Sequence, residues 1–329
     1  MSTIQVQAPG LLTTVQDLGR QGFGPLGVSP SGAADPISLR LGNRLVGNHE
    51  GAAGLEMMLL GGTFIFPQGA IVALTGSDFG ATLDDVSLNL STSVEARPGQ
   101  TIRLGPTKSG ARCYLCVQGG ISVKPFLRSA STHILSGLGG FEGRPLQKGD
   151  VVRIESSTEP FRRRTIAPAI SEHLSRRKVL RVTAGPQADW FSESSLRSFY
   201  ASTYRVGEQS NRMGLRLESG LERGLETGLE DGRERAAVSQ RSVSHMITEG
   251  VSLGAIQVPT RGSPIILFVE QQTTGGYPKI ANVISVDLHR VGQLRPRDEI
   301  RFEQVTFEAA RSLLIEQEKL LSSRELILE

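Results

Sequence analysis

The sequence is short of cysteine, of aromatic residues and of long apolar runs, and each shortage excludes a class of function. Two cysteines cannot by themselves supply the four ligands of a zinc site. Aromatic residues make up 5% of the chain, too few for the basic and aromatic surface that binds nucleic acid. No apolar run reaches the length of a membrane span, and the N-terminus has no signal-peptide pattern. The sequence therefore predicts a cytoplasmic protein without nucleic-acid or membrane partners.

The two cysteines, Cys113 and Cys116, form a C-x-x-C within the stretch RCYLCVQGG, which has the composition of a β-strand. A separation of three residues places two strand side chains on opposite faces of a sheet. A redox site would also want a helix N-terminus. The five histidines are scattered and no pair has metal-ligand spacing. We therefore predict two buried thiols and no metal site.

Strand signals dominate the rest of the chain. Apolar content of 38% and charged content of 21% over 329 residues are ordinary for a globular protein of about two domains. Short β-branched runs are separated by Gly, Pro, Asp and Ser clusters, a pattern typical of a mainly β (α+β) fold with few helices. The expected strands cover residues 3–7, 61–66, 70–76, 152–156, 178–185, 263–270 and 299–305.

Two helices are expected. The first has Asp35 as its N-cap and Pro36 at the first helical position, and it ends at Gly47. The second runs from about Thr306 to Leu321, where leucines recur at helical spacing.

A domain boundary is predicted in residues 160–178, a basic and proline-containing stretch without periodicity that we interpret as a solvated linker. This gives an N-terminal domain over 1–165 and a C-terminal domain over 178–329. Residues 220–230 repeat Gly-Leu-Glu every four residues. Because each interior glycine weakens a helix, we interpret this repeat as an exposed insertion.

Several nucleotide and hydrolase motifs are absent or unconvincing. GFGPLG at 22–27 matches G-x-G-x-x-G, but Pro25 removes a backbone amide where a pyrophosphate site needs one. A turn-rich loop is the better interpretation. The chain has neither a Walker A sequence nor a G-x-S-x-G elbow.

Two polar segments resist a purely structural interpretation. The glycine-rich stretch 10–36 carries Asp17, Arg20 and Asp35. Asp17 and Arg20 are either a structural ion pair or a pair that reads an anion, and Asp35 alone is a helix cap. Asn211 and Arg212 precede a strand, where the arginine either clamps a carboxylate or pins a turn.

The loop QQTTGGYPKIA at 271–281 is the third and most unusual segment. Gly275 and Gly276 allow close backbone approach and free two amides to donate. Gln272, Thr273 and Thr274 add further donors and acceptors, while Tyr277 and Lys279 offer a phenol and an ammonium. Lys279 is one of only six lysines in the chain. Loops on rigid β scaffolds are where chemistry collects, so this loop favours function over incidental polarity.

These residues make a family recognisable. The chain resembles the biotin-dependent carboxyltransferase family, which is also known as allophanate hydrolase subunit 2, KipA or the 5-oxoprolinase C-subunit. The resemblance covers nearly the whole chain in the right order. The matching stretches are residues 9–48, 114–121, 139–150, 210–219, 249–259 and 271–296.

The resemblance implies two cyclophilin-like β-barrel domains that face each other, with the site between them. It also implies two partner subunits, one of the KipI type and one of the LamB/YcsF type. The favoured function is the C-subunit of an ATP-dependent 5-oxoprolinase, active only in complex. One alternative is the carboxyltransferase component of a biotin-dependent urea or amide carboxylase. The other is a non-enzymatic regulatory partner of a KipI-like kinase inhibitor.

Site residues follow from the three polar segments together with the resemblance. The expected catalytic residues are Lys279, Tyr277, Asp17 and Thr274. The expected substrate-binding residues are Arg20, Asp35, Asn211, Arg212, Gln272, Thr273, Gly275 and Gly276.

The sequence also departs from the family pattern in places. Glu270 stands where the family usually has aspartate, so the charge is kept but its reach changes. Ala130 replaces an arginine within the family's S-R-S-T segment, and Arg128 and Arg297 stand where glycine is usual.

Overall fold

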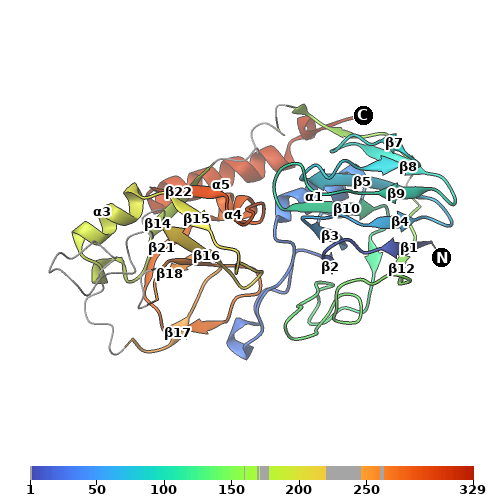
Figure 1. Ribbon diagram of the computed structural model, residues 1–329. Helices are drawn as coiled ribbons and strands as arrows, with labels where there is room; N and C mark the ends of the chain where they lie inside the picture. The colour runs from blue at the N-terminus through green and yellow to red at the C-terminus, as the bar shows by residue number, and fades with distance from the viewer. Residues whose placement is uncertain (1, 159, 169, 171–177, 220–245, 260–262) are drawn as a thin grey trace.

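The computed structural model describes residues 2–158, 160–168, 170, 178–219, 246–259 and 263–329. Figure 1 shows two β-rich halves side by side, with the strands up to β12 in one half and those from β14 to β22 in the other. The mainly β fold with few helices is confirmed. The Gly-Leu-Glu repeat at 220–230 lies outside the described residues.

The N-terminal half is built from two antiparallel sheets around one apolar core. One sheet has the order β11-β12-β1-β4-β9-β6-β7, and the other has the order β2-β3-β10-β5-β8. Side chains of both sheets meet in a single buried cluster, which is the expected core of a two-layer β fold. The strands are β1 (Thr3–Ala8), β2 (Thr13–Gln16), β3 (Gly54–Met58), β4 (Thr63–Ile65), β5 (Ala70–Gly76), β6 (Thr82–Leu83), β7 (Val86–Ser87), β8 (Ser93–Ala96), β9 (Thr101–Arg103), β10 (Arg112–Val117), β11 (Ile121–Ser122) and β12 (Val151–Ile154).

The C-terminal half is a closed barrel with the order β14-β21-β18-β19-β16-β15-β22. Its first and last strands, β14 and β22, pair in parallel and close the cylinder, which leaves the sheet without an open edge. A two-stranded ribbon of β17 and β20 lies outside it. The strands are β14 (Val179–Ala184), β15 (Tyr204–Val206), β16 (Gly214–Ser219), β17 (Glu249–Gly250), β18 (Ala255–Gln257), β19 (Ile265–Leu267), β20 (Thr274–Gly275), β21 (Lys279–Val283) and β22 (Glu299–Gln304).

Both predicted helices are confirmed. In α1 (Pro36–Leu45) the Asp35 carboxylate accepts the Ser38 backbone N–H at 2.9 Å, as an N-cap does. In α5 (Phe307–Ser322) the Thr306 side chain caps the first turn. The sequence did not predict α3 (Glu193–Ala201) or α4 (Leu288–Val291). The short 3-10 turns are η1 (Gly24–Leu26), η2 (Ala188–Trp190), η4 (Ser285–Asp287) and η5 (Arg324–Leu326).

The central strand β10 is buried on both of its faces. Cys113 packs into the core between the two sheets, whereas Cys116 packs against α1 on the other side. This confirms the prediction that the two cysteines lie on opposite faces of one strand, and both are free thiols.

We expect both thiols to resist alkylation in the folded protein. Burial raises the pKa of the Cys116 thiol to about 12 and raises that of Cys113 as well, and the thiolate is the form that reacts. Intact mass after iodoacetamide treatment should show no adduct on the native chain and both cysteines modified in guanidinium chloride. An adduct on the native protein would contradict this burial.

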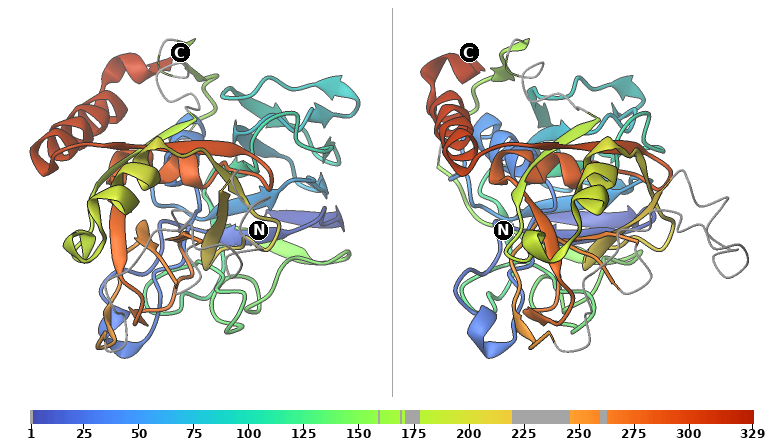
Figure 2. Two further views of the ribbon diagram at one scale, coloured as in Figure 1. Left: turned by 60° about the vertical axis from the view of Figure 1, so that its left-hand side comes forward. Right: turned by 90° about the vertical axis from the view of Figure 1, so that its left-hand side faces the viewer.

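The last residues of the chain return to the N-terminal half. Strand β13 (Thr165–Ile166) pairs with β23 (Ile327–Leu328), and Leu321 and Leu326 pack in the apolar cluster that covers α1. Figure 2 shows α5 running along the outside of the molecule towards this contact. The linker interpretation is therefore wrong at 165–166, because these residues form a strand. The domain limits 1–165 and 178–329 stay a prediction.

A close backbone contact joins the two halves at Gly292. A Cβ at this position would lie against the carbonyl group of Ala34, and backbone on both sides leaves little room to yield. We expect Gly292→Ala to lower the free energy of unfolding by roughly 1–3 kcal/mol, measured in guanidinium chloride. Gly24→Ala is the control, because its Cβ would meet nothing within 4 Å. Equal unfolding midpoints for both variants would refute the expectation.

Candidate functional site

Two of the three polar segments singled out in the sequence, residues 10–36 and the Asn211–Arg212 pair, come together where the two halves meet. The Ser31 backbone N–H donates to the Val269 carbonyl oxygen at 2.8 Å, and Arg212 Nη2 donates to the Gly32 carbonyl oxygen at 2.7 Å. Figure 1 shows η1, the long segment between β11 and β12, and β17 along the lower edge, and Figure 2 keeps them at that edge. Residues distant in sequence therefore meet at this junction.

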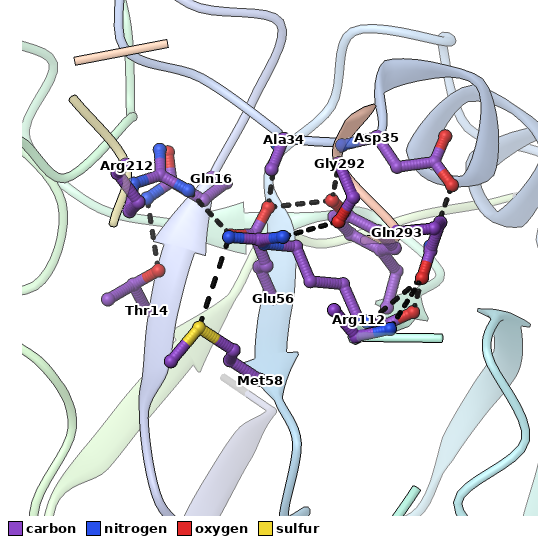
Figure 3. A network of polar contacts seen from close by, with 12 residues as sticks. Thr14, Gln16, Ala34, Asp35, Glu56, Met58, Arg112, Arg212, Gly292 and Gln293 are labelled. Atoms are coloured by element: carbon purple, nitrogen blue, oxygen red, sulfur yellow. Dashed lines mark hydrogen bonds and ion pairs between the residues drawn. The ribbon is translucent and has the colours of Figure 1, made fainter. Parts of the chain in front are cut away.

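Four charged side chains are buried between the halves, and we call them the interface network: Glu56, Arg112, Arg212 and Glu270. Each is at most 6% exposed. Arg212 Nη1 donates to Glu56 Oε1 at 2.6 Å, and Arg212 Nε donates to Glu270. Arg112 Nε lies 3.4 Å from the same Glu56 oxygen (Figure 3). Two positive and two negative charges face one another, which offsets part of the desolvation cost of burying them.

Glu56 is the centre of this network. Its second oxygen accepts the Tyr114 hydroxyl at 2.6 Å and the Ala34 backbone N–H at 2.8 Å. Burial alone would raise the pKa of this carboxyl, but the Arg212 and Arg112 guanidinium groups outweigh burial and hold the pKa below its usual value. Glu56 is therefore ionised and fully engaged.

Asp35 is held by the same interface. Its carboxylate accepts the Ser38 N–H and hydroxyl, and Gln293 Nε2 donates to it at 2.8 Å. Gln293 also accepts the Arg112 backbone N–H at 2.9 Å (Figure 3). Asp35 thus caps α1 and ties it to the C-terminal half, while its predicted substrate-binding role stays a prediction.

Asp17 and Arg20 both hold Ser131. The Asp17 carboxylate accepts the Ser131 hydroxyl, the Ser129 hydroxyl at 2.7 Å and the Ala130 backbone N–H at 2.6 Å. Arg20 Nη2 donates to the Ser131 carbonyl oxygen. Among the described contacts, the two side chains meet through this serine and not as a direct ion pair.

Arg20 keeps unused hydrogen-bonding capacity. It is 2% exposed, yet among the described residues its Nε and Nη1 have no hydrogen-bond partner. The Phe126 ring lies 5.5 Å from its guanidinium carbon. Burial lowers the pKa of this guanidinium, and the charges of Asp17 and Glu270 oppose that effect. A buried guanidinium with two unpartnered nitrogens is suited to a carboxylate or another anion.

His133, which was not predicted as a site residue, is affected by the charges of Glu270, Arg20 and Arg212. Its side chain is half-buried, and its Nδ1 accepts the Ser136 backbone N–H at 3.2 Å. Burial lowers the pKa of this imidazole, and the charge of Glu270 opposes the effect. The ring is therefore neutral near pH 7.

A cavity of about 190 Å³ opens beside the interface network. Its charged wall contains Arg112, Arg212 and Glu270, and Asn211 lines it as well. The Asn211 side chain is already used, because its Oδ1 accepts the Met213 backbone N–H at 2.8 Å. The remaining wall is mostly apolar and includes Leu12, Met58, Leu59, Ile134, Leu135, Met213, Leu215 and Leu294.

The loop after Glu270 builds a second polar group around Lys279, which we call the Lys279 cluster: Lys279, Glu249, Gln187, Gln257 and Gln272. The ammonium of Lys279 pairs with Glu249, and Gln187 Nε2 donates to the same Glu249 oxygen at 2.9 Å. Lys279 is 3% exposed. Its ammonium and the Gln187 amide lower the pKa of Glu249. The cluster therefore holds a buried cation with a half-exposed counter-ion.

The other loop residues lie around this cluster. Thr274 and Gly275 pair with β17, and the Thr273 carbonyl oxygen accepts the Val251 backbone N–H at 3.1 Å. Gly276 lies close to Thr248. Tyr277 is 45% exposed and lines a separate surface hollow with Arg205 and Arg297. Within the described residues, no side-chain hydrogen bond joins Tyr277 to Lys279.

The structure thus forms two groups from the predicted residues, and the sequence missed members of both. Asp17, Arg20, Asp35, Asn211 and Arg212 lie at the junction of the halves, and the residues from Gln272 to Lys279 lie on or beside the outer wall of the barrel. Most of the missed residues belong to three types that the sequence indicates only weakly: charged residues within apolar strands, glutamines that become buried, and one histidine. The missed residues are Glu56, Arg112, Tyr114, His133, Gln187, Glu249, Gln257, Glu270 as a network member, and Gln293.

Arg128 and Arg297, which stand where the family usually has glycine, both adopt a backbone conformation typical of glycine. Arg128 has φ 63° and Arg297 has φ 72°, so both lie in the left-handed region that favours glycine. The Arg297 side chain forms an exposed ion pair with Glu208.

Comparison with known proteins agrees with this architecture. The family model of the carboxyltransferase domain, subdomain A and B, matches residues 26–304. The chain therefore belongs to this carboxyltransferase family, as its sequence predicted.

Relatives of two kinds match this chain. The chain is 34% identical over 316 residues to the C-subunit of 5-oxoprolinase from Escherichia coli (strain K12), covering 96% of each. It is 33% identical over 331 residues to urea amidolyase of Saccharomyces cerevisiae, covering 98% of this chain but 18% of that protein. The crystal structure of the Kluyveromyces lactis urea amidolyase superposes with a TM-score of 0.86 at 30% identity, covering 99% of this chain and 21% of that one.

Neither a membrane-spanning helix nor a metal-binding cluster is present in the described part of the chain. None of its helices has both the length and the apolar character needed to cross a bilayer. Within the same residues, no group of three or more His, Cys, Asp and Glu side chains is arranged to hold a metal ion.

Proposed function

We propose that this chain is the C-subunit of a cytoplasmic 5-oxoprolinase, which uses ATP to open the lactam of 5-oxoproline to L-glutamate. The observation that carries the proposal is the 34% identity to the C-subunit of a 5-oxoprolinase along 96% of both chains. Activity is proposed to require two partner subunits, one of the KipI type and one of the LamB/YcsF type.

The two groups of polar residues, one at the junction of the halves and one around Lys279, offer the side chains that this reaction needs. Opening a lactam adds water across its C–N bond and develops negative charge on the carbonyl oxygen, which hydrogen-bond donors stabilise. Lys279 and the backbone amides of Gly275 and Gly276 are proposed to serve this oxygen. Arg20 is proposed to hold the substrate carboxylate, because Arg212 already donates from three nitrogens to Glu56, Glu270 and Gly32.

ATP would supply activation of the lactam oxygen when bound in the complex. The GFGPLG loop of this chain does not fit a phosphate site, because its only helical turn is the three-residue η1 within it, which contains Pro25. We therefore do not propose this loop as the ATP site. Asp17 is proposed to position the Ser129–Ser131 segment, since both of its oxygens accept hydrogen bonds there.

Carboxyl transfer from carboxybiotin is the second candidate function. It is favoured by the fold shared with urea amidolyase over 99% of this chain. In that reaction the same donors would stabilise the biotin enolate that remains after transfer. This candidate expects activity only with a biotinylated carrier protein.

Glutamate release from 5-oxoproline and ATP tests the proposal. We expect no release by this chain alone and release when it is co-expressed with its KipI-type and LamB/YcsF-type partners. Silence from a soluble and assembled complex would refute the oxoprolinase proposal. Carboxylation of urea that streptavidin blocks would then establish the second candidate.

A further inference from the structure

Gln257 is a buried side chain on the outside of the barrel. Its neighbours Ile256 and Val258 belong to the barrel core, so strand alternation directs Gln257 to the outer wall. It is nevertheless only 1% exposed, because the loop that contains Gln272 and Gly275 covers it. Because water does not reach this amide, its hydrogen-bond partners must lie beneath the loop.

The strand register places Gln257 beside Lys279. The two residues are Cα partners between β18 and β21, next to an irregularity that follows Ile256. Directly opposed residues of an antiparallel pair project their side chains from the same face of the sheet. β-Bulges are common next to active sites, where they re-aim a side chain. Gln257 and Lys279 therefore share the space under the loop.

One end of the Gln257 amide is fixed and the other is unused. Its Oε1 accepts Gln272 Nε2 at 3.2 Å, which orients the amide. Among the described residues, its Nε2 has no acceptor. A buried donor without a partner is costly and rare in folded proteins.

Gly275 allows the loop to approach this donor. A Cβ at Gly275 would lie 2.5 Å from Gln257 Nε2, so a larger residue would occupy the space in front of the amide. Gly275 also pairs with Glu249, the counter-ion of Lys279. Gly275 is thus a neighbour both of the unused N–H of Gln257 and of the counter-ion of Lys279.

We propose that Gln257 is a second side-chain donor to the ligand oxygen that Lys279 serves, and that this oxygen belongs to an amide or lactam carbonyl group. The identity of the ligand rests on the proposed function. A neutral N–H beside an ammonium fits a carbonyl oxygen that gains negative charge, because both donors strengthen as that charge develops. Gln272 is a positioning residue in this arrangement, since it acts through Gln257.

The test compares Gln257→Met with Gln317→Met in the full complex. Gln257→Met removes the buried donor that has no partner. It also removes the acceptor of Gln272, but Gln272 is exposed and water can replace that acceptor. We therefore expect a melting temperature equal to or above that of the wild type. We expect its kcat for glutamate release to fall by about 10²-fold. Gln317 is a buried glutamine whose Nε2 donates to the Val286 carbonyl oxygen at 3.2 Å. Its variant should melt earlier and keep the wild-type kcat.

The outcomes separate this inference from the proposed function. If the wild-type complex is active and Gln257→Met stays within about twofold of its kcat, the second donor is refuted and the function stands. If the wild-type complex releases no glutamate, the proposed function is refuted. The comparison of the melting temperatures of Gln257→Met and the wild type then tests the inference about Gln257. Gln257→Met melting below the wild type would then show that the Gln257 amide serves the stability of the fold and would overturn the inference.

Discussion

Glu56→Ala is expected to lower the free energy of unfolding by roughly 3–5 kcal/mol, the usual cost of removing one partner from a buried ion pair. The variant would leave the Arg112 and Arg212 guanidinium groups buried without their shared carboxylate. Guanidinium chloride unfolding followed by circular dichroism measures the change. Glu299→Ala is the matched control, because Glu299 forms an exposed pair with Arg205 in the barrel. That variant should stay within about 0.5 kcal/mol of the wild type.

The stabilisation by Glu56 should also depend on pH. The folded-state pKa of Glu56 is below its ordinary value of 4.5, so the unfolded chain binds the proton more readily. The contribution is therefore fully present above pH 4.5 and is lost as the pH falls through the folded-state pKa. The stability difference between the wild type and Glu56→Gln should shrink on acidification. A difference that grows towards low pH would contradict the ionised state assigned to Glu56.

Lys279→Ala is expected to reduce glutamate release by the assembled complex by about 10²–10³-fold, the usual effect of removing one donor from an oxyanion site. The chain should remain folded, because the counter-ion Glu249 is 45% exposed and water can solvate it. Lys319→Ala is the control, since that lysine is exposed on α5. Equal kcat values for Lys279→Ala and the wild type would remove Lys279 from the mechanism.

The backbone elements were largely predictable because their signals are local. Asp35 and Pro36 mark the start of α1 through capping geometry, and alternating β-branched runs indicated the main strands of both halves. The helix α3 was missed although Ser192 caps it and Phe199 packs in the barrel core. Its many serines have low helix propensity, and tertiary packing overrides that preference.

The site was predictable only in part, because its partners come from distant segments. The composition of the 271–281 loop singled out Lys279, but no local sequence pattern indicates the interface network. Glu56 and Arg112 lie in β3 and β10 and meet Arg212 only once the barrel docks. The predicted substrate-binding role of Arg212 stays a prediction, and three of its nitrogens already have protein partners that the sequence did not indicate.

The return of the C-terminal residues to α1 has a practical consequence. A chain cut between residues 170 and 178 would give two fragments with complementary exposed surfaces. The first fragment would expose α1 and the free edge of β13, while the second would carry β23 with Leu321 and Leu326 uncovered. Since each fragment carries the surface that the other covers, we expect the two pieces to bind each other when they are mixed.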